Sequence, residues 1–299
     1  ITEIFYKNIK EVDPNIFIVK HKKKDNSLIR CSVANQKCED FTPSNKNISD
    51  LLEGDLELNG AAYQYLGKNL NLENIGILKG YKKIKFNNSD IFYDEGVRIS
   101  INEEEAIINI FQNKPGARVF FNNGKLVNLK INYNGFDLKE NNEFDLKIFP
   151  PNYPIDSKTL TGCLTFANLL VSKITVNAEN SSCEDTVNFV NVIGDIDLVS
   201  ITNSFSDALD IDFSKLKIDK INITSALNDC ADFSAGNYIL GTLNLKNCGD
   251  KALSVGEKSF IKLETINASN ANLGIASKDS SIVQATEVNL DNLETCVAA

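Results

Sequence analysis

Apolar and polar residues alternate in short runs in the second half of the chain, and the alternation repeats every 22 residues. One repeating position holds small residues, in the order Ala208, Cys230, Ala252, Gly274 and Cys296. The next position is apolar in the same coils and holds Leu209, Ala231, Leu253, Ile275 and Val297. Alternation with a period of two predicts β-strands, and a fixed longer period predicts stacked structural repeats.

A second set of strand positions precedes the first in each coil. It contains the apolar pairs Ile221/Ile223, Leu243/Leu245, Ile266/Ala268 and Val288/Leu290. A coil of this size cannot bury its apolar face alone, whereas stacked coils pair in parallel at about 4.8 Å per rung. The L-x-x-L-x-L-x-x-N pattern of leucine-rich repeats is missing. We therefore predict an all-β fold, a right-handed parallel β-helix solenoid with coils of about 22 residues.

The distribution of proline divides the chain. All six prolines lie at or before Pro154, and proline interrupts strand ladders. We predict an irregular β-rich N-terminal region over residues 1–155, either a cap or a separate small domain, with early coils starting at about residue 85. The β-helix should fill residues 156–299 with roughly six or seven coils. We expect it to continue beyond Ala299.

The charge balance and the apolar content limit the possible partners. The chain has 31 basic and 40 acidic residues and a net charge of −9, which argues against nucleic acid and anionic membranes as partners. No run of about 18 apolar residues is present, so no membrane span is expected. With His21 as the single histidine, Ser-His-Asp and Cys-His catalysis are not expected.

Seven cysteines and no CxxC motif favour an oxidising, extracytoplasmic setting. Cys31 and Cys38 bracket a polar loop and are one candidate disulfide pair. Cys163 and Cys183 should lie diagonally on neighbouring rungs and are the second candidate pair. Position 230 and position 296 are three rungs apart, so those two cysteines cannot pair. We predict a protein that is secreted or displayed on a cell or virion surface.

Acidic residues form the most conspicuous polar pattern of the repeat. Asp185, Asp207 and Asp229 are spaced by 22 residues and should form a vertical ladder, and three residues further on lie Asn188, Asp210 and Asp232. If Leu209 and Ile211 point inward, then Asp210 and Asp212 point outward. They would line a shallow outer groove together with the small residues of the Ala208 position.

Three roles for these acids are open at the level of the sequence. They can be structural, bonding backbone N–H groups at the coil corners. They can bind a glycan through its hydroxyls, or a cation such as Ca²⁺, using Asp185, Asp207, Asp210, Asp229, Asp232 and Lys251. They can also be catalytic, with Asp207, Asp229 and Asp210 acting as general acid and base on a glycosidic bond.

The coil pattern resembles the right-handed parallel β-helix superfamily, the pectate-lyase-like fold. Within it, SDALDID, NDCADFSAG and GDKALSVGE resemble three successive motifs of polygalacturonase-type glycoside hydrolases. The resemblance implies that Asp207 matches the first acid and Asp229 an acid of the second motif. The chain departs from the motifs in two places, since Asn228 replaces an Asp and Lys251 replaces the His. The resemblance further implies a surface or extracellular protein that handles polysaccharide.

We predict a structural or adhesive surface protein without enzymatic activity, which contacts glycans or assembles with copies of itself or with other surface proteins. One alternative is a polysaccharide hydrolase or lyase that uses the acidic ladder, and another is a phage or virus tail or decoration protein. The alternatives differ in the environment of the acids. Catalysis needs acids that converge in an open groove, with a raised pKa, whereas a structural ladder binds backbone N–H groups.

Overall fold

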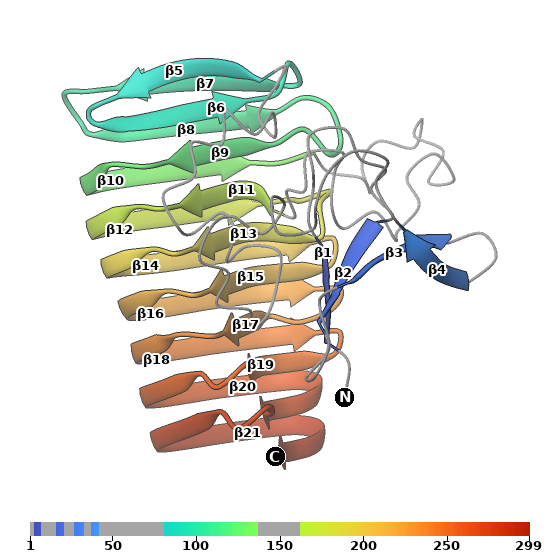
Figure 1. Cartoon of the computed structure of the whole chain (residues 1–299). Coiled ribbons are helices and arrows are strands. Elements are labelled where there is room, and N and C mark those ends of the chain that lie inside the picture. The colour runs from blue at the N-terminus through green and yellow to red at the C-terminus, as the bar shows by residue number, and fades with distance from the viewer. Residues whose placement is uncertain (1–2, 7–15, 21–26, 33–36, 42–80, 137–161) are drawn as a thin grey trace. The chain divides into compact units, whose positions relative to one another are not determined.

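A computed structural model of the chain describes the backbone of residues 3–6, 16–20, 27–32, 37–41, 81–136 and 162–299, and the side chains of the last two ranges (Figure 1). Within these ranges all regular elements are β-strands, and none is a helix that could cross a membrane. The chain divides into two compact units, Ile1–Lys79 with Ser157–Thr159, and Gly80–Asp156 with Leu160–Ala299. The smaller unit contains an antiparallel sheet of β1 (Glu3–Tyr6), β2 (Ile16–Lys20), β3 (Ser27–Ser32) and β4 (Lys37–Phe41).

The larger unit is a parallel β-solenoid of about 8 turns, which confirms the predicted all-β solenoid with coils of about 22 residues (Figure 1). The first strand column consists of β9 (Val119–Asn122), β11 (Gly162–Ala167), β13 (Asp185–Val190), β15 (Asp207–Asp212), β17 (Ala231–Ser234) and β19 (Lys251–Gly256). The second strand column consists of β8 (Ile107–Gln112), β10 (Lys125–Asn134), β12 (Leu170–Glu179), β14 (Ile193–Ser204), β16 (Lys215–Ala226) and β18 (Asn237–Cys248). The last two strands, β20 (Phe260–Ser277) and β21 (Ile282–Ala298), run through both columns.

Like residues stack on one another inside the coils. The ring of Phe166 lies 4.9 Å from that of Phe121 and 4.8 Å from that of Phe189, all three in register on successive rungs. The ladder continues through Ile211 and Phe233, and all five side chains are fully buried. Because each coil is thin, most of its apolar surface is removed from water only by the coils above and below it.

Asparagine occupies many of the corners where the backbone turns. Its φ lies between 51° and 58° at the corner after the second column, at Asn180, Asn203, Asn247, Asn270 and Asn292. Asparagine tolerates this left-handed conformation better than most residues do. The corner amides also bond along the stack, since Asn270 Nδ2 donates to Asn247 Oδ1 at 2.8 Å and Asn292 Nδ2 donates to Asn270 Oδ1 at 2.7 Å.

The two ends of the solenoid are built differently. At the N-terminal end, β5 (Lys82–Phe86) and β6 (Ser89–Tyr93) pair antiparallel above β9, and β7 (Val97–Asn102) pairs antiparallel with β8. We call these three strands the cap. At the C-terminal end, β21 pairs with β20 and with no other described strand.

Two disulfides lie in the described coils, in keeping with an oxidising environment. Cys163 bonds to Cys183 across a Cα–Cα distance of 5.4 Å, which confirms one predicted pair. Cys230 bonds to Cys248, a pair that was not predicted, and Cys296 is an exposed free thiol. The other predicted pair lies outside the residues whose side chains are described; its backbone positions, 31 and 38, are register partners on β3 and β4.

Candidate functional site

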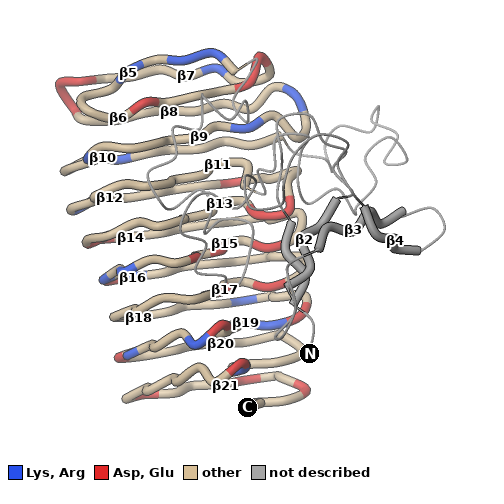
Figure 2. Tube along the Cα trace, viewed as in Figure 1, with Lys and Arg blue, Asp and Glu red and all other residues tan. Residues whose placement is uncertain are grey.

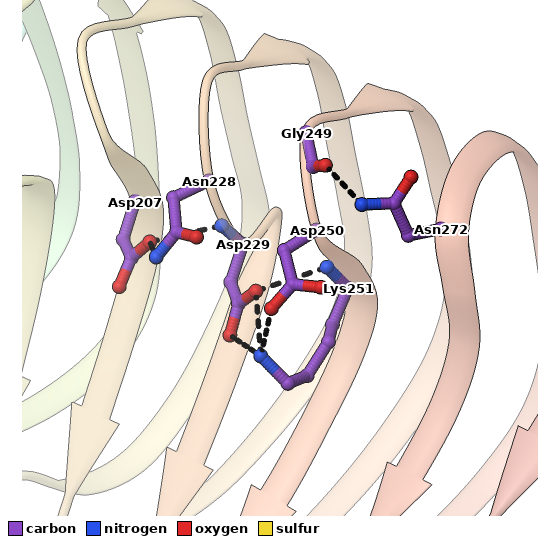
Figure 3. A network of polar contacts seen from close by, with 7 residues as sticks. All are labelled: Asp207, Asn228, Asp229, Gly249, Asp250, Lys251 and Asn272. Carbon is purple, nitrogen blue, oxygen red and sulfur yellow. Dashed lines mark hydrogen bonds and ion pairs between the residues drawn. The ribbon is translucent and has the colours of Figure 1, made fainter.

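Asp185, Asp207 and Asp229 form the predicted ladder, which we call the corner ladder, at the entry to the first strand column. Asp185 and Asp207 begin β13 and β15 and are register partners. The third acid lies one coil further, in the turn before β17. Figure 3 shows its environment, in which the acids alternate with backbone N–H groups of the following coil. The sequence left the orientation of Asp207 open, and the corner directs its carboxylate toward the next coil.

The corner ladder is a chain of side-chain-to-backbone hydrogen bonds. Asp207 Oδ1 accepts from the backbone N–H of Asp229 at 2.9 Å and from Asn228 Nδ2 at 2.7 Å. One coil later, Asp229 Oδ1 accepts from the backbone N–H of Lys251 at 2.9 Å. This is the arrangement expected of a structural ladder, because Asp207 and Asp229 each accept a hydrogen bond from a backbone N–H group at the corner of the following coil.

Lys251 neutralises Asp229, the last acid of the corner ladder. Its Nζ lies 3.2 Å from both carboxylate oxygens of Asp229 and also contacts Asp250 (Figure 3). Asp229 is only 3% exposed, whereas Lys251 is partly exposed. Lys251 is therefore engaged in ion pairs within the scaffold.

Burial raises the pKa of two ladder acids, Asp207 and Asp229. It raises the pKa of Asp207 to about 6, against the opposing effect of the hydrogen bond from the Asp229 backbone. Burial also raises the pKa of Asp229, against the hydrogen bond and the positive charge of Lys251. A carboxyl with a pKa near 6 is protonated often enough near neutral pH to donate a proton.

A second acidic group lies on the outer face of the first column, and we call Asp210, Asp212, Asp232 and Glu257 the strand cluster. Leu209 and Ile211 are fully buried, as predicted for inward positions, whereas Asp210 is half-buried and Asp212 is buried. Asp210 is in register with Asn188 and Asp232, and Asn188 Nδ2 donates to its Oδ2 at 2.7 Å. The structure thus brings these predicted site residues together on neighbouring rungs.

Two members of the strand cluster have raised pKa values. Asp210 and Asp212 lie two residues apart on β15, where burial disfavours the charged form of each carboxyl group. Burial, with further contributions from neighbouring negative charges, raises the pKa of Asp212 to about 7 and that of Asp210 well above its usual range. Among the residues that the structure describes, no group of three or more His, Cys, Asp or Glu is arranged to hold a metal ion.

The prediction that the small residues of the Ala208 position line an outer groove beside these acids is wrong. Ala208, Cys230 and Ala252 are 0% exposed, so the small residues of this position are packed inside the solenoid. All three residues belong to the hydrophobic core cluster, and Cys230 bonds to Cys248 at the end of β18.

Two separate cavities lie along the outer face of the second strand column, and sequence reasoning missed them. One of about 740 Å³ is lined by Asn222, Asn244, Asn267 and Asn289, and the other of about 410 Å³ is lined by Asn109, Asn132 and Asn177. We call the two together the asparagine groove. Its sequence signal is an Asn between the two apolar residues of the second-column pairs, as in I-N-I and L-N-L, with Ser200 in its place in β14.

The amides of the asparagine groove bond to one another along the stack. Asn244 Nδ2 donates to Asn222 Oδ1 at 2.8 Å, and the two following amides continue the chain at 2.9 Å each. Asn132 and Asn177 continue the same pattern in the earlier coils, at 2.9 and 3.0 Å. A primary amide has two N–H donors and two acceptor lone pairs. Each amide in the middle of the stack therefore keeps one donor and one acceptor for a ligand.

The coil geometry and the parallel register define the class of protein, a parallel β-solenoid. No family model, curated protein or solved structure matches the chain.

Proposed function

We propose that the chain is a structural and adhesive β-solenoid without enzymatic activity, which acts outside the cytoplasm on a cell or virion surface and binds a glycan along the asparagine groove. The groove is the observation that carries the proposal. The two disulfides support an oxidising location. The same features suit a tail or decoration protein of a phage or virus.

The groove chemistry fits an extended chain of hydroxyl groups. Its amides offer neutral donors and acceptors that repeat at about 4.8 Å, the spacing of the rungs. The rim of the larger cavity includes Thr224 and Ser269, and its charged lining residues are Lys246 and Asp291, one of each sign. This lining favours a neutral polysaccharide over a strongly charged one. Because individual hydrogen bonds to water-exposed amides contribute little net free energy, affinity would come from many repeats in a row.

The environment of the corner ladder supports a role other than catalysis. Asp207 and Asp229 already accept hydrogen bonds from the backbone of the next coil, and Lys251 neutralises the second of them. Both carboxyl groups are therefore already hydrogen-bonded to the scaffold, which leaves them less available to a substrate oxygen.

Affinity electrophoresis in native gels that contain single polysaccharides tests the binding proposal. We expect retardation by at least one neutral polysaccharide, and loss of that retardation in an Asn244→Ala/Asn267→Ala variant. A matched control is Lys215→Ala/Lys217→Ala, which changes exposed residues of β16 that do not line the groove. Unretarded migration of the folded wild type across the whole panel would reject the proposal, as would equal retardation of the groove variant.

A second candidate function, hydrolysis of a glycosidic bond, is favoured by one observation. The raised pKa values, about 6 for Asp207 and about 7 for Asp212, lie in the range that a general acid needs near neutral pH. A reducing-end assay on the same polysaccharides tests it, comparing the wild type with an Asp207→Asn/Asp229→Asn variant. Turnover that disappears in this variant while the protein stays folded would replace our proposal with this one.

A further inference from the structure

The asparagine ladder of the second strand column is interrupted once between Asn109 and Asn289. At the interruption, Asn177 on β12 is in register with Ser200 on β14, which is in register with Asn222 on β16. Every other rung of this stretch carries an asparagine at the same register position. Ser200 therefore separates an earlier run of amides from a later run. We call Ser200 together with its two neighbouring amides the ladder break.

The amides of both runs donate in the same direction. Asn177 Nδ2 donates to Asn132 Oδ1 at 3.0 Å, and Asn244 Nδ2 donates to Asn222 Oδ1 at 2.8 Å, so each donor belongs to the later coil. Among the described residues, Asn177 Oδ1 accepts no hydrogen bond and Asn222 Nδ2 donates none. The earlier run therefore ends at the break with a free carbonyl oxygen, and the later run begins there with two free N–H groups.

The serine at the break does not join the two runs. Asn177 and Asn222 are two rungs apart, roughly 10 Å. The side chain of Ser200 is shorter than that of an asparagine and forms no hydrogen bond within the described part of the chain. Ser200 is half-buried and lines the smaller cavity, and Asn222 lines the larger one. The break thus leaves the space of a missing amide group on the rung where the smaller cavity ends, next to the rung where the larger one begins.

Few charges lie beside the break. The charged residues of β14 and β16 lie in the first parts of these strands, up to Asp197 and Lys220, and Figure 2 shows them as coloured segments followed by tan. Two positions beyond the break, Thr202 and Thr224 add hydroxyl groups, and their register partner Glu179 is the charged residue that lines the smaller cavity. These groups suit a ligand with many hydroxyl groups better than a highly charged ion.

We propose that the ladder break is the principal sugar-binding subsite of the asparagine groove, where one sugar unit of a neutral polysaccharide bridges the two amide runs. One hydroxyl of this unit donates to Asn177 Oδ1, and another of its oxygen atoms accepts from Asn222 Nδ2. Amides in the middle of a run share their donors and acceptors with their neighbours, whereas the two amides at the break keep a whole carbonyl oxygen and a whole NH₂ group for the sugar. The inference rests on the proposed function and names the subsite that anchors the polysaccharide.

Ser200→Asn closes the break and tests the proposal. The new amide would donate to Asn177 Oδ1 and accept from Asn222 Nδ2, so one continuous ladder would fill the free space. Native gels cast with hydroxyethyl cellulose, galactomannan, dextran or laminarin supply the probes. For the polysaccharide that retards the wild type most strongly, we expect the dissociation constant to rise at least about fivefold, because two hydrogen bonds to the sugar unit are lost.

Thr242→Asn is the matched control for this variant. Thr242 lies on β18, two positions before Asn244, and does not line either cavity. The substitution adds the same amide to the same strand column and leaves the break open. We expect the dissociation constant of this control to stay within about twofold of the wild-type value, since no group of the subsite changes.

Asn222→Asp tests the same subsite without closing it. An aspartate keeps an oxygen that accepts from Asn244 and lacks both of the N–H groups that are free at the break. We expect a rise in the dissociation constant comparable to that of Ser200→Asn, with a melting temperature close to that of the wild type. Thr242→Asp adds the same charge outside the cavities and should bind like the wild type, which separates the lost donor from the added charge.

The outcomes distinguish failure of this subsite from failure of the proposed function. Thermal melts show which variants are folded, and Asn222→Asp carries the test if Ser200→Asn does not fold. Wild-type affinity in either folded variant overturns the subsite and leaves glycan binding along the groove in place. An equal loss of affinity in the matching Thr242 control overturns the subsite as well. A wild type that none of the four polysaccharides retards overturns both proposals.

Discussion

The first and the last coil of the described solenoid differ in how their apolar interior is covered. Every coil buries its interior only against its neighbours, so the first and the last coil need a cover. The cap supplies this cover with antiparallel strands, and Ile91 of the cap strand β6 is fully buried. The last coil has no such cover in the described chain, and Val288 is 44% exposed at a position where the preceding coil has a fully buried Ile266.

The difference shows that sequence pattern and burial are separable in a repeat protein. Val283, Leu290 and Leu293 of β21 follow the inward pattern of the earlier coils, yet they are only partly buried. A periodic sequence specifies which way a side chain points, whereas a neighbouring layer decides whether water reaches it. The contribution of a residue to stability should therefore depend on its coil and not only on its ladder position.

The largest expected effect is a difference between core truncations at the two ends. Ile91→Ala in the cap should lower the free energy of unfolding by about 2–5 kcal/mol, because it leaves a cavity in a packed interior. Val288→Ala in the last coil should lower it by less than about 1 kcal/mol. Urea denaturation followed by circular dichroism measures both. Equal losses would mean that the last coil is covered in solution.

The disulfides give the next largest effect and probe whether the C-terminal coils open independently. Loops of 20 and 18 residues predict a loss of about 2–4 kcal/mol for either Cys163→Ala/Cys183→Ala or Cys230→Ala/Cys248→Ala. Hydrogen exchange should locate the two losses differently. The second variant should increase exchange from β17 to β21 and leave the cap protected. Uniform deprotection would show that the ends are coupled.

The pH dependence of the free energy of unfolding probes the middle of the stack, because Asp207 and Asp212 lie in β15. Asp207 and Asp212 have raised pKa values of about 6 and about 7, so the folded state binds protons that the unfolded state has released above about pH 4. The stability from these protons is fully present below about pH 4 and is lost as pH rises through 6 and 7. We expect a decrease of roughly 1–3 kcal/mol between pH 4.5 and 8.

A variant separates this effect from the general charge of the protein. Asp212→Asn removes one titrating group and should flatten the dependence measured by thermal denaturation between about pH 4.5 and 8. Asp291→Asn on β21 removes the same charge from the exposed end and serves as the control. An unchanged slope in the first variant would show that the strand cluster does not titrate over this range.

The smallest expected effect comes from the corner asparagines. Asn270 bonds to the amides of the coils on both sides, whereas Asn292 donates to one preceding amide. Replacement by Ala should therefore cost about 1 kcal/mol at position 270 and about half of that at position 292. Asn270→Gly keeps the left-handed corner accessible and should recover part of the loss. Thermal melts that rank the two alanine variants in the reverse order would contradict the comparison of the ends.

Much of the scaffold could be predicted from the sequence because stacking places chemically similar residues at equal spacing. The spacing of 22 located β15 and its successors, the inward position of Leu209, and the alignment of Asp207 with Asp229. It also brought Cys163 close enough to Cys183 for a bond. The spacing of the rungs alone did not reveal the partner of Cys230. The bond joins Cys230, directly before β17, to Cys248 at the end of β18, and both residues belong to one coil.

The sequence by itself determined the period of the coil, the inward and outward alternation and the ladders of acids, because these follow from local geometry repeated along the chain. Only the tertiary structure decided where the surface is hollow. It packed the small position of Ala208 inside, committed the Asp207 carboxylate to a backbone N–H, and exposed the amide of Asn244 in a groove. Corner geometry and contacts between columns fix these outcomes, and neither is encoded in the period of a repeat.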